Sequence, residues 1–132
     1  MTTFTIPGPA RGKARPVVFR NRHAVSPDPG WFQYNVRKAA QEAGLTPKDG
    51  PVCVTVSVTK MISQSTSKKR RASMLGRRCA TIPDAANVEA AVHDALEGIA
   101  YQNDRQIAES HFHRHWGEQD QTVVTVFYLE EV

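Results

Sequence analysis

Hydrophobic and polar residues alternate most regularly over residues 52–59, which we interpret as the clearest strand in the chain. Valines occupy every second position, and the positions between them hold Cys53, Thr55, Ser57 and Thr59. Because successive side chains of a strand point to opposite faces, this strand should bury one face and keep the other polar. Shorter apolar runs predict further strands over residues 3–6, 17–19, 106–116 and 122–129.

Two other segments show the spacing of an amphipathic helix. In the first, apolar residues recur on one side and Gly44 supplies a stop; they are Phe32, Val36, Ala39, Ala40 and Ala43. The second begins at Asn87 and carries an apolar stripe at positions 88, 91, 92, 95, 96 and 99. The resulting order, β, β, α, β, basic segment, α, β, β, predicts one α+β domain over residues 1–132, with two main helices packed on a mixed sheet.

Charge divides the chain into a basic and an acidic part. Residues 1–83 contain 15 Lys and Arg against 3 acids, whereas residues 84–132 contain 2 against 10. This division favours a metal-dependent nuclease, because cations hold phosphate and carboxylates hold Mg²⁺. An ordinary protein with uneven surface charge would show the same division.

Cellular location and thiol chemistry follow from weaker signals. No apolar run approaches the roughly 18 residues of a membrane span, and the first residues lack the pattern of an export signal. We therefore expect a cytoplasmic protein with no membrane contact. Its two cysteines, Cys53 and Cys79, have no metal-ligand spacing and are expected to be free thiols.

The most specific pattern spans residues 83–107. It contains PDAAN at 83–87, DALEGIAY at 94–101 and NDRQI at 103–107. These motifs resemble the signature of the RusA family of Holliday-junction resolvases, which reads roughly P-D-x-D-N-x-x-K-x-x-x-D-A-L-x-G, then an aromatic residue, then D-D-x-Q-[VI]. The basic segment ahead of the signature and the N-terminal TIPG, followed by Lys13 and Arg15, are also similar to the family.

The resemblance implies a fold, an activity and a set of site residues. Members of the family are homodimeric, Mg²⁺-dependent endonucleases that nick four-way DNA junctions symmetrically, often in phage or prophage recombination. Their site uses three aspartates and a lysine. By this correspondence the first aspartate is Asp84 and the third is Asp104, while Ala86 takes the place of the second aspartate and Ala90 that of the lysine. Asn103 stands where the family has the first of two paired aspartates, and Asp94 matches the aspartate of D-A-L.

The chemistry of phosphodiester hydrolysis explains these residue types. Mg²⁺ activates water and neutralises the leaving oxygen, and carboxylates hold it. In an extended segment, residues 84 and 86 would point to the same side, a lysine at 90 would lie over the same ion, and Asp104 would complete the cluster. Because Ala86 and Ala90 lack these groups, we expect an inactivated form that still binds junctions. The alternatives are a natural, non-catalytic binder of branched DNA and a generic RNA-binding module.

Several residues have both a functional and a purely structural interpretation. We predict phosphate contacts from Lys13, Arg15, Lys68, Lys69, Arg70 and Arg71, although a charge run is often only solvated. Taken alone, Asp84 is typical of a helix cap and Asp104 of a turn. On a strand, His111, His113 and His115 share a face, which suits a metal site but favours DNA or a dimer partner. We expect Trp31, Tyr34 and Trp116 in the core or at an interface.

Overall fold

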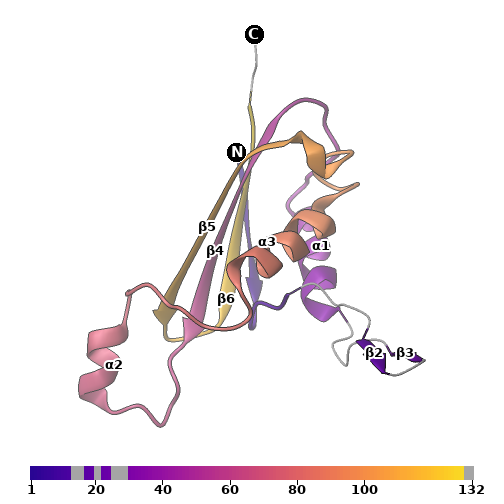
Figure 1. The fold of residues 1–132 in the computed structure, drawn as a ribbon. Coiled ribbons are helices and arrows are strands. Elements are labelled where there is room, and N and C mark those ends of the chain that lie inside the picture. Colours follow the sequence, from indigo (N-terminus) through magenta and orange to yellow (C-terminus); the bar gives the residue numbers. More distant parts are fainter. Residues whose placement is uncertain (13–16, 20–21, 25–29, 130–132) are drawn as a thin grey trace.

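The structure is a computed structural model that describes residues 1–12, 17–19, 22–24 and 30–129 (Figure 1). A mixed four-stranded sheet has the order β1-β6-β4-β5, formed by β1 (Thr2–Pro7), β6 (Gln121–Tyr128), β4 (Val52–Met61) and β5 (Ile107–Gly117). A separate pair consists of β2 (Val17–Phe19) and β3 (Arg22–Ala24). The helices are α1 (Trp31–Glu42), α2 (Lys68–Met74), α3 (Ala85–Leu96) and the short 3₁₀ helix η1 (Asp104–Gln106). The predicted α+β class is confirmed.

Strand β4 lies at the centre of the sheet and sets its register. It is antiparallel to β6 and parallel to β5, with Cys53 opposite Glu109 and Thr55 opposite His111. A parallel pair needs a long crossover. Here the crossover is residues 62–106, and it contains α2, α3 and η1.

The core lies between the sheet and two helices. Helices α1 and α3 pack side by side on one face of the sheet, as Figure 1 shows. The even-numbered valines of β4 are buried beneath them, as the alternation predicts, together with Val88, Val92, Leu96, Val124 and Val126. The odd-numbered residues of β4 face the other side, where Cys53, Thr55 and Ser57 are only half-buried. The second face of the sheet is therefore open.

Helix α2 was not expected from the pattern. It begins after Ser67, whose hydroxyl accepts a hydrogen bond from the Arg70 N–H at 3.2 Å. None of its residues is buried, so it has no apolar stripe by which a helical period could be detected. It lies beyond the end of the sheet, away from α1 and α3 (Figure 1). No helix in the described part of the chain is long and apolar enough to cross a membrane.

Two aromatics of α1 were expected in the core or at an interface, and the structure excludes the core. Trp31 and Tyr34 do not lie in the core, because 64% and 57% of their surfaces are exposed. Phe32 and Val36 provide the buried side of α1, which turns positions 31 and 34 outward. Their rings contact each other edge to face, with centroids 6.1 Å apart. Trp116, in contrast, is half-buried.

Candidate nuclease site and nucleic-acid interface

Asp84 caps the N-terminus of α3. Its backbone is extended, and its Oδ1 accepts a hydrogen bond from the Asn87 N–H at 2.8 Å. Arg114 of β5 holds the chain that leads to it, because Nη1 donates to the Pro83 carbonyl at 2.5 Å and Nε to the Cys79 carbonyl at 3.3 Å. Asp84 is thus exposed but firmly positioned, and its capping role agrees with the structural interpretation of an aspartate before a helix.

Ala86 and Ala90 lie on the first two turns of α3. The expectation of an extended segment at 84–86 was wrong, because the helix begins at Ala85 rather than at Asn87. Residues four apart lie on the same side of a helix, so Ala86 and Ala90 share a face near Asp84. Ala86 is exposed and Ala90 half-buried. Their methyl groups offer neither an oxygen ligand nor a positive charge.

Asp104 lies at the other end of α3. It begins η1, where the side chains of Asn103 and Gln106 cap the turn reciprocally. Its charge acts on His93 in the last turn of α3. The 12 residues of α3 span about 18 Å at the usual rise. One chain therefore does not bring Asp84 and Asp104 together.

The residues of a single chain do not fit a Mg²⁺ site. Among the described residues, no three side chains that include Asp84 or Asp104 bring their ligand atoms within 4.8 Å of one another. One oxygen of Asp84 already accepts the capping hydrogen bond, and position 86 offers no ligand. Mg²⁺ demands near-octahedral oxygen coordination, which this arrangement does not provide.

A polar contact that was not expected from the sequence links α3 to β5. Ser110 Oγ donates to Glu89 Oε2 at 2.6 Å and lies 3.1 Å from His93 Nε2. Burial lowers the pKa of His93, although the charges of Glu89 and two aspartates partly oppose the change. In the sequence, this contact is indicated only by the spacing of Glu89 and His93, which are four residues apart and therefore share a face of the helix. These contacts link the helix directly to the edge strand of the sheet.

A basic cleft lies beside the N-terminus of α3. It encloses about 700 Å³ and is lined by Arg78, Ala85, His113, Arg114 and His115, among others. Helix N-termini attract phosphate, and Ala85 is the first residue of α3. Neither Arg78 nor Arg114 was expected to bind DNA, because both fall outside the run at 68–71 and only the fold brings them together.

A second basic surface is provided by α2. Lys68, Lys69 and Arg70 are exposed, whereas Arg71 is half-buried and donates to the Ser63 carbonyl at 3.2 Å. A shallower hollow of about 410 Å³ joins α2 to the basic cleft through Arg70, Arg77 and Arg78. Lys13 and Arg15 lie outside the described residues, so their assignment stays a prediction.

Comparison with known proteins shows the family. The model of the family described as endodeoxyribonuclease RusA matches residues 7–127. The chain therefore belongs to the RusA family, whose members are endonucleases that act on Holliday junctions and generally depend on a divalent metal. An uncharacterized protein of Bacillus subtilis strain 168, YqaN, is 30% identical over 132 residues, which cover 93% of each chain.

Proposed function

We propose that this chain is a single-domain junction-binding protein of the RusA type, held catalytically silent by Ala86 and Ala90. The observation that carries the proposal is the position of the two alanines. Both lie on the turns of α3 that follow Asp84, within the residues that the family model matches. We further propose that it acts in the cytoplasm of a bacterial cell, encoded by the host or by a phage.

The basic surfaces support junction binding without catalysis. The cationic side chains of α2 are exposed, and the cleft beside α3 adds Arg78 and Arg114. Phosphate contacts of this kind supply much of the affinity of DNA-binding proteins and do not require an intact hydrolytic site. Binding should therefore survive the loss of cleavage.

The two alanines account for the proposed inactivity. Position 86 lacks the carboxylate that the family places there, and position 90 lacks the ammonium group. Loss of a single charge-stabilising group commonly lowers a rate by roughly 10²–10³. The loss of both should leave nicking close to background in Mg²⁺, the metal we propose for the active form.

A homodimer would resolve the separation of the two aspartates. Because α3, about 18 Å long, separates Asp84 from the segment that carries Asp104, we propose that a site shared by two chains joins Asp84 of one to Asp104 of the other. A two-fold dimer would contain two such sites. This arrangement suits paired, symmetric nicks in a four-way junction.

A competition experiment tests the proposal on the chain as it stands. A labelled four-way junction is bound in Mg²⁺, and unlabelled junction, linear duplex and RNA hairpin compete. We expect the junction to compete at least about tenfold better than either alternative, with no nicked product. Equal competition by the RNA hairpin would favour a generic nucleic-acid-binding module, and efficient nicking would overturn the role given to the alanines.

A further inference from the structure

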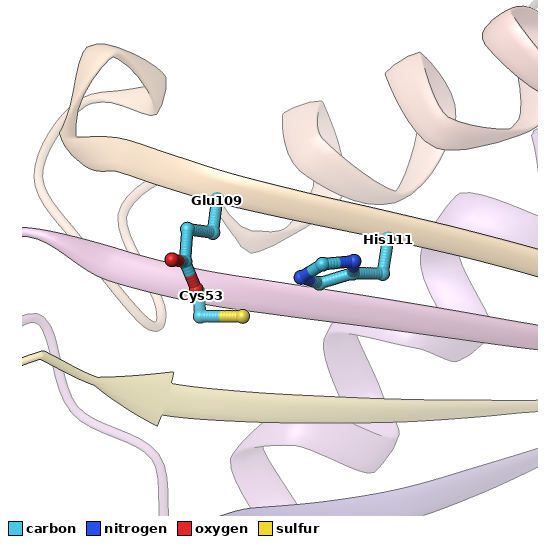
Figure 2. Close-up of side chains that lie close together, drawn as sticks. All are labelled: Cys53, Glu109 and His111. Carbon is cyan, nitrogen blue, oxygen red and sulfur yellow. The ribbon is translucent and has the colours of Figure 1, made fainter.

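Three metal-ligating side chains meet on the open face of the sheet (Figure 2). They are Cys53 of β4 with Glu109 and His111 of β5, and one ligand atom from each lies within 4.8 Å of the other two. The parallel register explains the meeting. Cys53 is paired with Glu109, and His111 follows two residues later on the same face of β5.

The neighbours of these residues show that the cluster lies across the sheet from α3. Val52 and Val54 flank Cys53 and are fully buried in the core. Ser110, between Glu109 and His111, bonds to Glu89 of α3. Because side chains alternate along a strand, the cluster must point to the opposite side, where Cys53 is half-buried and the other two are exposed.

We propose that Cys53, Glu109 and His111 form a binding site for Zn²⁺ or a similar borderline divalent ion. Thiolate, imidazole and carboxylate are the ligands that zinc takes in proteins, whereas Mg²⁺ selects oxygen ligands. In a zinc tetrahedron neighbouring ligand atoms lie roughly 3.3–3.8 Å apart. Glu109 and His111 are exposed, so their side chains are free to rotate from the present spacing of up to 4.8 Å toward that of the tetrahedron. A fourth position stays open to water.

The other two histidines of β5 do not belong to this site. Among the described residues, neither His113 nor His115 brings a ligand atom into this group, and both lie farther along β5 from the position paired with Cys53. His115 Nε2 lies 3.2 Å from Thr59 Oγ1. The site therefore depends on a contact between strands, and a bound ion would link β4 to β5.

Cobalt spectroscopy tests the site without reference to nuclease activity. Co²⁺ is titrated into the purified, reduced protein while absorption is recorded, and Zn²⁺ or Mg²⁺ is then added. We expect a thiolate-to-cobalt charge-transfer band in the near ultraviolet that saturates at one ion per chain. Zn²⁺ should abolish the band, whereas excess Mg²⁺ should leave it unchanged.

Matched variants separate this site from other thiols and histidines. Cys53→Ser should abolish the band, while Cys79→Ser, at the buried second cysteine, should keep it. Glu109→Gln and His111→Ala should each weaken Co²⁺ binding strongly, because each removes one of the three protein ligands, and His113→Ala should leave it unchanged. Circular dichroism checks that every variant is folded.

Zinc should also stabilise the folded chain, because an ion that binds only the native state shifts unfolding by mass action. We expect saturating Zn²⁺ to raise the melting temperature of the parent and of Cys79→Ser but not of Cys53→Ser. If the parent shows no charge-transfer band, or if the band survives in Cys53→Ser, the proposed site is wrong.

Discussion

Asp84 caps the first turn of α3, and Asp104 lies beside its last turn, so the helix itself holds the two aspartates apart. The 12 residues of α3 span about 18 Å at the usual helical rise, which is far more than one metal ion can bridge. The local sequence signature places them only 20 positions apart, which hides this separation.

Mixed dimers should reveal a site shared between chains. In a variant in which Ala86→Asp and Ala90→Lys restore the family residues, Asp84→Asn or Asp104→Asn alone should abolish nicking. When the two inactive proteins are mixed and allowed to exchange subunits, half of the dimers would pair unlike chains. Each of these would hold one site with both aspartates, so about a quarter of the sites should regain activity.

The readout of this experiment is single-strand nicking of a four-way junction. Sites contained within single chains would give no recovery, because every chain in the mixture lacks one aspartate. Light scattering at micromolar concentration provides the control for assembly. A monomer of 14.7 kDa under these conditions would contradict the proposed dimer.

Replacing each of the two alanines with the residue expected from the family should recover nuclease activity to different extents. Ala86→Asp returns a carboxylate beside Asp84 and should recover part of the Mg²⁺-dependent nicking. Ala90→Lys alone should recover little, because the carboxylate at position 86 would still be absent. The double variant should exceed the product of the two single gains, since groups that act in one transition state are strongly non-additive.

A mobile four-way junction in Mg²⁺ is the substrate for this measurement, with Ca²⁺ as a control that supports binding but little cleavage. Suppose the double variant binds junctions tightly and never nicks them. The chain would then be better described as a natural, non-catalytic binder of branched DNA.

Neutralising α2 should weaken junction binding and its dependence on salt. Only Lys68, Lys69 and Arg70 should be replaced. Arg71 donates a hydrogen bond to the Ser63 carbonyl, so its replacement would also disturb the fold. Replacing the three with Gln should flatten the slope of log K against log salt by about one unit for each lost phosphate contact. The effect should be the same for different junction sequences.

A matched control for α2 comes from α1. Arg37 and Lys38 are exposed and lie on a helix at the other side of the molecule (Figure 1). Their replacement with Gln changes the net charge in the same direction and should leave the salt slope nearly unchanged. Equal effects of the two sets would mean that α2 is only solvated surface.

His93 should make stability depend on pH. Burial lowers its pKa below the usual 6.5, so below about pH 6.5 the unfolded chain binds this proton more strongly than the folded chain. The free energy of unfolding should therefore fall as the pH drops through 6.5, until the folded pKa is reached. Above about pH 6.5 His93 should no longer change the free energy of unfolding with pH.

Urea unfolding of His93→Gln at several pH values tests this prediction. Gln keeps a polar group near Ser110 but does not titrate. The free energy of unfolding should therefore decrease less steeply below about pH 6.5 than it does in the parent. His113→Gln on β5 is the matched control, because that side chain is exposed. An unchanged profile in His93→Gln would exclude His93 as the source.

Repeating local patterns were sufficient to predict most of the fold. The valine alternation of β4 and the apolar stripe of α3 report directly which side is buried, because each element repeats with its own period. The family signature placed Asp84 just ahead of α3, but Ala86 was expected in an extended segment, whereas the helix begins at Ala85. Helix α2 escaped prediction because it buries no residue and therefore carries no such period.

Contacts between distant segments were decided by the tertiary structure. Cys53 meets Glu109 and His111 only because β4 and β5 pair in parallel at one particular register. That register depends on the packing of α3 and on the long crossover between the strands, and no local pattern encodes it. Asp84 and Asp104 lie much closer in sequence than Cys53 and Glu109, yet the rigid rise of α3 keeps them apart.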